Sequence, residues 1–282
     1  MKLVSYEVEG AATYGAVKDG GIVNLARRMG SDYPDLASIL DTQLDSARDI
    51  VATAEPELPL EDARFLPVIP RPSKILMAAV NYDDHRRETR RDHTESPVLF
   101  IRLADSQVGH RQPIVRPSVS ERLDYEGELA LVIGKAGRHI SQDEAMDHVA
   151  GFSCYNDGTV RDWQRHTSQF TPGKNFASTG AFGPWLVTAD EIADPFNLDL
   201  VTRVNGQELQ RTNTSLLIHS MQRLIAYIST FTPLWPGDVI VTGTCAGVGF
   251  ARTPPIFLKS GDTVEVEISG VGTLVNPVVD EA

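Results

Sequence analysis

Two glutamates, Glu126 and Glu128, are the residues of this sequence whose types and spacing point most directly to chemistry. They lead straight into the apolar run Leu129–Ile133. Because side chains alternate between the two faces of a strand, both glutamates fall on the face that also carries Ala130 and Val132. Two adjacent buried carboxylates cost several kcal/mol per ion unless a cation, a proton or an Arg or Lys side chain compensates them. A metal ion is the simplest compensation, although the spacing alone fits a solvated strand edge equally well.

The same chain contains a second Glu-x-Glu pattern, at Glu265 and Glu267. There the apolar residues Val264, Val266 and Ile268 occupy one face and the glutamates the other, which is typical of a half-buried strand with one face in water. We therefore expect this second pair to be solvated rather than to bind a ligand.

A third carboxylate, Asp157, favours a metal site. It follows the apolar strand predicted at 151–155, and Arg161 and Gln164 lie four and seven residues farther on, on one face of a predicted helix. Three carboxylates with no thiolate or imidazole nearby favour a hard divalent cation, Mg²⁺ or Mn²⁺. The alternative is that Asp157 is an ordinary turn or cap residue.

A histidine and a glutamate, His85 and Glu88, are three residues apart and would share a helix face. The carboxylate could then fix the imidazole tautomer and raise its basicity for proton transfer. Arg86, Arg87 and other arginines surround the pair, so a solvated charged helix is the alternative interpretation.

A lysine and a glycine-rich loop complete the set. Lys174 could balance the carboxylates or stabilise a developing enolate, whereas a surface lysine is the alternative. The loop at 242–249 contains Thr244 and three glycines, and its backbone N–H groups and hydroxyl suit a carboxylate ligand. A plain tight turn would have much the same sequence.

The elements that must position these residues are mostly strands. β-branched and aromatic residues predict strands at 3–8, 13–24, 75–80, 98–101, 129–133, 152–155, 185–187, 239–242 and 263–268. Ser/Thr-x-x-Glu capping boxes predict helix starts at Ser141 and Thr188, the first helix ending at Gly151. Apolar residues at helical spacing predict one long amphipathic helix between Asn213 and Phe231. Five prolines between 55 and 72 predict an extended connector, so we place a domain boundary near residue 68, with a small domain at 1–68 and a second at 69–282.

Composition bounds the possible functions. The chain has 282 residues and a net charge of −12, which opposes binding to nucleic acid. Two cysteines without a Cys-x-x-Cys pair favour a reducing compartment, and the absence of a signal-like start or a long apolar run predicts a cytoplasmic protein without membrane contact. P-loop, zinc-protease, Gly-x-Ser-x-Gly and Rossmann patterns are missing.

Taken together, these residues resemble the fumarylacetoacetate hydrolase superfamily, in particular its bacterial acylpyruvate hydrolase-like members. The resemblance runs from about residue 70 to the C-terminus. Its motifs, in order, are Asn81-Tyr82 with His85 and Glu88, Asp124-Tyr125-Glu126-Gly127-Glu128, Asn156-Asp157 with Arg161-Asp162 and Gln164, Gly173-Lys174, Gly183-Pro184, Asn205-Gly206, Pro236-Gly237-Asp238 and Thr242-Gly243-Thr244.

The resemblance implies a fold class of α+β, mostly β, with a mixed β-sandwich roll behind a small N-terminal α/β domain. It also implies a homodimer and a small-molecule 2-oxo acid substrate. The cofactor implied is Mg²⁺ or Mn²⁺, which Ca²⁺ could replace in crystals. The metal ligands implied are Glu126, Glu128 and Asp157; the catalytic residues His85, Glu88 and Lys174, with the first two on a lid; and the substrate contacts Arg161, Gln164 and Thr244.

The sequence departs from the family pattern around the substrate. Cys245 stands where the loop commonly has proline, Arg102 where many relatives carry lysine, and Ala177 where an acid is common. We predict a metal-dependent hydrolase that cleaves a carbon–carbon bond in an acylpyruvate-like 2,4-dioxo acid. The alternatives are an oxaloacetate-type decarboxylase, a keto–enol isomerase of an unsaturated dicarboxylic acid and, less favoured, a non-catalytic carboxylate-binding protein.

Overall fold

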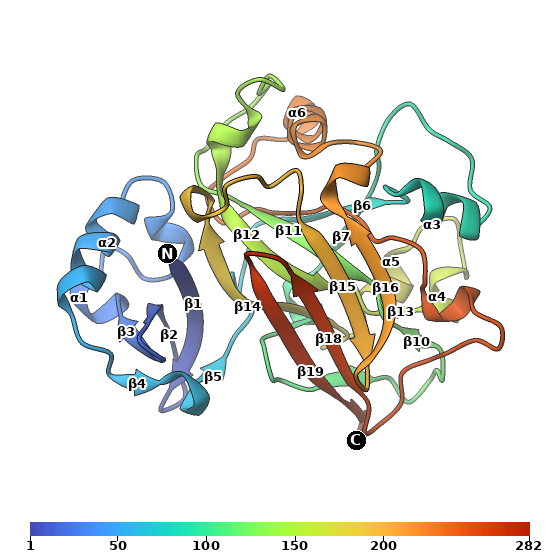
Figure 1. Ribbon diagram of the computed structural model, residues 1–282, viewed down its shortest axis with the longest axis horizontal. Coiled ribbons are helices and arrows are strands. Elements are labelled where there is room, and N and C mark those ends of the chain that lie inside the picture. The colour runs from blue at the N-terminus through green and yellow to red at the C-terminus, as the bar shows by residue number, and fades with distance from the viewer.

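The computed structural model describes residues 1–282 and has the predicted α+β, mostly β organisation (Figure 1). The strands are β1 Lys2–Val8, β2 Ala11–Lys18, β3 Gly21–Asn24, β4 Leu58–Pro59, β5 Arg64–Phe65, β6 Ile75–Ala79, β7 Val98–Arg102, β8 Gln107–Val108, β9 Ile114–Arg116, β10 Leu123–Asp124, β11 Gly127–Ile133, β12 Val149–Asn156, β13 Thr159–Val160, β14 Gly180–Thr188, β15 Asp199–Val204, β16 Gln207–Asn213, β17 Val239–Val241, β18 Thr263–Ile268 and β19 Gly272–Asp280. The helices are α1 Ala26–Met29, α2 Leu44–Thr53, α3 Asp83–Glu88, α4 Arg161–Gln164, α5 Thr171–Lys174 and α6 Met221–Phe231. None of them is both long and apolar enough to cross a membrane.

Two sheets pack against each other to form the main body. The larger has 12 strands and runs β4-β3-β2-β1-β14-β12-β11-β17-β6-β7, with β5 and β8 at its sides, and the smaller runs β16-β15-β18-β19-β9. Alternate residues of β11 face opposite cores: Leu129 and Leu131 pack with residues of the smaller sheet and α6, whereas Ala130 and Val132 pack on the other face. β11 is therefore buried along its whole length.

The N-terminal segment continues the large sheet. β1 pairs antiparallel with β14, with Leu3 opposite Leu186. Side chains from the first 69 residues share one apolar cluster with Met77, Val132 and other residues of the central strands. In Figure 1 this segment forms the lobe at the left, on the far side of β14 from the β15–β19 layer. The boundary near residue 68 stays a prediction.

Two of the predicted helices are shorter than expected. The capping box at Ser141 does form, since its hydroxyl bonds both the N–H and the carboxylate of Glu144, at 3.3 and 2.8 Å. It starts only a 3₁₀ turn at Ala145–His148, because Val149 begins the central strand β12, and the predicted helix end at Gly151 is wrong. The box at Thr188 likewise starts one 3₁₀ turn, Ala189–Glu191.

The long helix predicted between Asn213 and Phe231 is present only in the C-terminal part of that range, as α6. Ser220 caps it by accepting a hydrogen bond from Arg223 N–H at 3.2 Å. The residues before the cap form β16, which ends at Asn213, and a 3₁₀ turn. The second Glu-x-Glu pattern behaves as expected: Val264, Val266 and Ile268 are buried, and the two glutamates are half-exposed.

Candidate active site

Three buried carboxylates meet where β11 and β12 lie side by side. Glu126 stands immediately before β11, Glu128 is its second residue, and Asp157 follows the end of the antiparallel neighbour β12. Their exposed fractions are 3%, 2% and 0%, and one oxygen from each lies within 4.8 Å of the others. We call Glu126, Glu128 and Asp157 the carboxylate triad. Its members come from segments about thirty residues apart, and the antiparallel pairing of Gly127 with Asn156 is what brings them together.

Lys174, from α5, is buried against the triad. Its ammonium group donates to Glu126 at 2.6 Å, to Thr159 at 2.8 Å and to Asp157. With an exposed fraction of 2%, it is not the surface lysine that the sequence left open.

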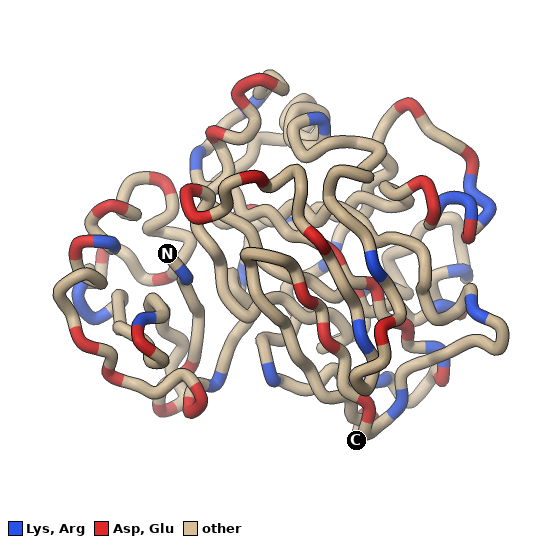
Figure 2. The backbone as a smooth tube through the Cα atoms, viewed as in Figure 1, with Lys and Arg blue, Asp and Glu red and all other residues tan.

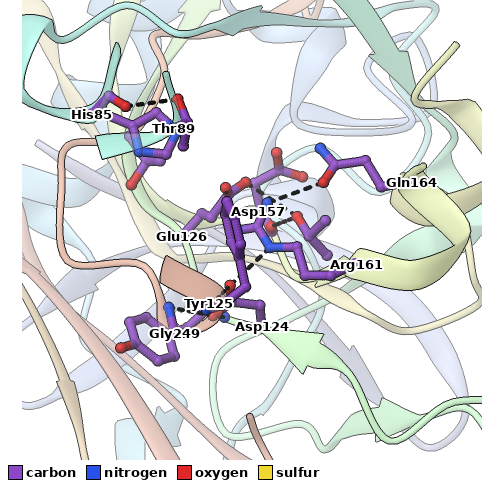
Figure 3. Close-up of polar contacts among 12 residues, drawn as sticks. His85, Thr89, Asp124, Tyr125, Glu126, Asp157, Arg161, Gln164 and Gly249 are labelled. Carbon is purple, nitrogen blue, oxygen red and sulfur yellow. Dashed lines mark hydrogen bonds and ion pairs between the residues drawn. The ribbon is translucent and has the colours of Figure 1, made fainter. Parts of the chain in front are cut away.

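Arg161, from α4, spans two carboxylates (Figure 3). Its Nε donates to Asp124 and its Nη2 to Glu126, both at 2.7 Å, and its Nη1 donates to the amide oxygen of Gln164 at 3.2 Å. The helix predicted here is present as α4, and it brings Arg161 and Gln164 together at the site. Burial alone would raise the pKa of Glu126, but the Arg161 and Lys174 charges outweigh it and hold that pKa well below its ordinary value.

Glu128 has no such partner. No cationic side chain forms an ion pair with it, and its one hydrogen bond comes from the backbone N–H of Gly243, at 2.7 Å. Burial, together with the charges of Asp157 and Glu126, raises the pKa of Glu128 well above its ordinary value. The buried network as a whole sets four carboxylates, the triad and Asp124, against three cations, Arg102, Arg161 and Lys174. With every group ionised the network therefore carries one net negative charge, and Glu128 is the carboxylate without a cationic partner.

This arrangement fits a divalent cation. The donors are hard carboxylate oxygens, which Mg²⁺ and Mn²⁺ prefer, and they converge on one side of a cavity rather than being enclosed. The triad could thus hold such an ion and leave part of its coordination sphere open to a ligand. The identity of the ion stays a prediction.

His85 and Glu88 form the predicted pair on α3. The Nδ1 atom of His85 lies 3.3 Å from a carboxylate oxygen of Glu88, whose other oxygen accepts the N–H of Gly247 at 3.0 Å. His85 is buried and lines the cavity, with Thr89 on the next turn of the chain (Figure 3). Glu88 is thus held in place from the glycine loop, and the free Nε2 is the atom of His85 able to exchange a proton with a ligand.

The glycine loop at 242–249 serves the protein itself. The sequence suggested that its N–H groups bind a substrate carboxylate, but those of Gly243, Gly247 and Gly249 donate to Glu128, Glu88 and Asp124. The hydroxyl of Thr244 donates to Gly127 O at 3.0 Å and accepts from Gln210 at 2.8 Å. The loop therefore fixes the acidic residues, while substrate contact by Thr244, which lines the cavity, stays a prediction.

Two positioning residues, Asp124 and Arg102, are named in the sequence analysis without a role at the site. Asp124 is fully buried, accepts N–H bonds from Gly249 and Phe250 at 2.8 and 3.0 Å, and anchors Arg161. Arg102, noted only as a departure from the family pattern, bonds Asp157 at 2.5 Å and Gly158 O at 2.9 Å. No local pattern predicts these roles, because Arg161, Gly249 and Phe250 lie more than 30 residues from Asp124, and Asp157 and Gly158 lie more than 30 residues from Arg102.

A cavity of about 350 Å³ opens above the triad. Its floor is polar and its walls include aromatic side chains. The residues that line it are Ala78, Ala79, Val80, His85, Thr89, Arg90, Arg91, Phe100, Glu126, Glu128, Asp157, Arg161, Gln164, Arg165, Phe170, Lys174, Thr244 and Phe250. All three predicted substrate contacts and all predicted metal ligands are in this set, together with His85 and Lys174.

A family model described as "Fumarylacetoacetate (FAA) hydrolase C-terminal" matches residues 74–279. The chain belongs to the fumarylacetoacetate hydrolase superfamily. The resemblance inferred from the motifs is thereby confirmed, and it covers nearly all of the chain beyond the N-terminal segment.

Relatives within this superfamily are enzymes of several kinds. The chain is 41% identical over 265 residues to human "Oxaloacetate tautomerase FAHD2A, mitochondrial", covering 92% of this chain and 84% of the relative. Maleylpyruvate hydrolase from Sphingobium sp. SYK-6, solved with manganese(II) and pyruvate, has a TM-score of 0.84 and 28% identity, with both chains fully covered. The 5-carboxymethyl-2-hydroxymuconate delta-isomerase of Mycobacterium smegmatis has a TM-score of 0.78 and 31% identity, also over both whole chains.

These comparisons confirm the fold class and support an enzyme. They do not separate a hydrolase from a tautomerase or isomerase, because all three activities occur among the matched proteins. The predicted cytoplasmic location stays a prediction, and the human relative is named as mitochondrial.

Proposed function

We propose that this protein is a divalent-metal-dependent enzyme that interconverts the keto and enol forms of oxaloacetate or a closely similar 2-oxo dicarboxylic acid. The observation that carries the proposal is the carboxylate triad with its uncompensated Glu128, open to a cavity that also contains His85 and Lys174. The likeness to an oxaloacetate tautomerase over 92% of the chain favours this reaction over the acylpyruvate hydrolysis predicted from the sequence.

In this proposal Glu126, Glu128 and Asp157 would hold the metal, which would supply a Lewis acid for the oxygens of a 2-oxo acid. His85 removes a proton from C3 of the keto form at Nε2, and returning a proton to the C2 oxygen completes the enol. Glu88, fixed by Gly247, keeps the imidazole oriented for this exchange.

Lys174 places a positive charge beside the reacting centre. Its ammonium lies 4.8 Å from the centre of the Phe100 ring, between that ring and the triad. A cation in such a poorly hydrated position stabilises the negative charge of an enolate more strongly than it would in water.

Acylpyruvate hydrolysis is the second candidate. The His85–Glu88 geometry also suits activation of a water molecule, and a hydrolase of this fold has been solved with manganese(II) and pyruvate. In that reaction the water oxygen would attack the 4-carbonyl, the carbon–carbon bond would break, and pyruvate and a second acid would be released.

One assay distinguishes the candidates. The purified protein, with Mg²⁺ or Mn²⁺ and then with excess chelator, is given enol oxaloacetate and separately an acylpyruvate. The proposal predicts chelator-sensitive loss of enol absorbance without release of carbon dioxide or of pyruvate. Pyruvate and a second acid formed from the acylpyruvate alone would favour the hydrolase instead, and carbon dioxide from oxaloacetate would favour a decarboxylase. Chelation that lowers the melting temperature with no activity to lose would indicate a structural cation site.

A further inference from the structure

The two buried cations of the cavity are already committed to the protein. All three donors of the Lys174 ammonium are taken, by Glu126, Asp157 and Thr159. Each of the three nitrogens of Arg161 also donates to a side-chain oxygen. Three of the five N–H groups of Arg161 are thus in use, so an anionic group that enters the cavity at a distance from the triad needs donors from other residues as well.

Three arginines at the opening of the cavity, Arg90, Arg91 and Arg165, are free to supply them. We call them the rim arginines. All three line the cavity and are exposed, and none forms an ion pair or a side-chain hydrogen bond. Figure 2 shows basic and acidic residues side by side at α3 and in the segment that follows it, where Arg90 and Arg91 lie. The arginines of α3 itself, Arg86 and Arg87, pair with Asp83, whereas Arg90 and Arg91 have no such partner.

Aromatic rings lie between two of the rim arginines and the buried cations. The Phe250 ring centre lies 4.3 Å from the guanidinium carbon of Arg161 and 4.8 Å from that of Arg165. The two guanidinium carbons are therefore no farther apart than the sum of these distances. The exposed Arg165 thus lies close to Arg161, the buried cation that donates to Glu126 of the triad.

A second aromatic path leads from Lys174 to Arg91. Lys174 faces Phe100, the Phe100 and Phe170 rings meet edge to face with centres 5.9 Å apart, and Arg91 lies 5.9 Å from the Phe170 centre. The ammonium of Lys174 has all three of its donors in use and Arg161 has three of its five, whereas the side chains of Arg91 and Arg165 donate no hydrogen bond. Stacking on a ring also restricts an arginine side chain, so less entropy is lost when it binds an anion.

We propose that Arg165 and Arg91 bind the distal carboxylate of the substrate and make the enzyme selective for dicarboxylic over monocarboxylic 2-oxo acids. This inference rests on the proposed function for the placement of the 2-oxo acid end at the triad. The distal carboxylate then points toward the opening, where the two arginines provide paired N–H donors suited to a carboxylate.

The test measures binding rather than turnover. L-Malate and L-lactate share the same 2-hydroxy acid end and differ by the distal carboxylate, and neither has the keto group that the reaction needs. Their affinities for the protein in Mg²⁺ are measured by calorimetry, for the unchanged chain and for Arg165→Gln, Arg91→Gln and the double variant. Arg87→Gln is the matched control, because Arg87 is an exposed arginine of α3 that does not line the cavity.

We expect malate to bind the unchanged protein at least tenfold more tightly than lactate. The double variant should lose about tenfold or more in malate affinity, the effect of removing a charged hydrogen bond, with lactate affinity unchanged. The Arg87→Gln variant should retain the full preference.

Equal affinity of the unchanged protein for the two acids, or no detectable binding of malate, overturns the inference, as does a preference that survives in the double variant. Its failure is distinguishable from failure of the proposed function. Loss of the preference in the double variant supports the inference even when the unchanged protein does not convert oxaloacetate, whereas conversion without the preference supports only the proposed function.

Discussion

Replacing Glu128 by glutamine separates the two effects that the structure attributes to this residue. Glu128 is buried, has no cationic partner and accepts one hydrogen bond, from Gly243. A glutamine keeps the shape and can accept the same bond, but it removes the uncompensated charge. We therefore expect Glu128→Gln to raise the free energy of unfolding of the metal-free protein, by about 1–3 kcal/mol, the usual cost of a buried polar group without its partner.

The same change should remove most of the stabilisation by metal. At a Mg²⁺ concentration 100 times the dissociation constant of the unchanged protein, binding adds about 2.7 kcal/mol to its free energy of unfolding. If the variant binds at least about 100-fold more weakly, the corresponding gain is at most about 0.4 kcal/mol. Adding metal should thus shift the stability difference between the two proteins by about 2.3 kcal/mol in favour of the unchanged protein.

Urea unfolding with and without Mg²⁺ measures both effects. Glu265→Gln is the matched control, because Glu265 belongs to the other Glu-x-Glu pattern, on the half-exposed face of β18. The control should match the unchanged protein in both conditions. A Glu128→Gln variant that is destabilised without metal, or stabilised by metal as strongly as the unchanged protein, would refute the reasoning.

Three further predictions concern single residues. Lys174→Met should lower turnover by about 10²–10³-fold, because it removes the positive charge beside the reacting centre. Mn²⁺ affinity, measured by calorimetry, should stay the same or rise, because the ammonium next to Glu126 competes with a cation. Weaker Mn²⁺ binding would contradict this. His85→Ala should abolish turnover with Mn²⁺ affinity nearly unchanged, and activity equal to that of the unchanged protein would remove the pair from the mechanism. Burial lowers the pKa of His110 to about 4 from its ordinary 6.5, and the Nδ1 of His110 accepts the Val275 N–H. The neutral imidazole therefore contributes fully to the free energy of unfolding above pH 6.5, and this contribution should be lost as the pH falls toward 4. His110→Asn should flatten that part of the stability profile by up to about 3 kcal/mol, whereas the exposed His139, replaced by Asn, should leave it unchanged.

The homodimer implied by the family resemblance stays a prediction. Sedimentation of the purified chain tests it directly. The edge strand β7 exposes Val98 and Ile101, and Leu103 after it is also exposed, so this edge has apolar surface that a second copy could cover.

Local sequence patterns predicted which residues belong to the site better than they predicted which residues contact one another there. The contrast between Glu126/Glu128 and Glu265/Glu267 was readable because strand alternation is a local rule, and the structure places the first pair in the interior and the second at a half-exposed face. The approach of Asp157 depends on the pairing of β11 with β12, which the motif order suggested but no spacing encodes.

What the sequence did not predict depends on contacts between distant segments. The use of the glycine loop to hold Glu128, Glu88 and Asp124 requires β17 to lie beside β11, so the same glycines fit a ligand site or a turn until the fold is known. The helix that was predicted at Ser141 failed for a similar reason. Its capping hydrogen bonds are local, but the strand that follows at Val149 is fixed by pairing on both of its sides.

The central claim, that the carboxylate triad binds a divalent cation, is tested most directly by a crystal structure of the protein grown with Mn²⁺ and recorded for the anomalous signal of manganese. The account predicts one manganese per chain, with oxygens of Glu126, Glu128 and Asp157 all at about 2.1–2.2 Å, close to the distance typical of small hard cations. An anomalous peak elsewhere, or none at the triad at saturating Mn²⁺, would contradict it.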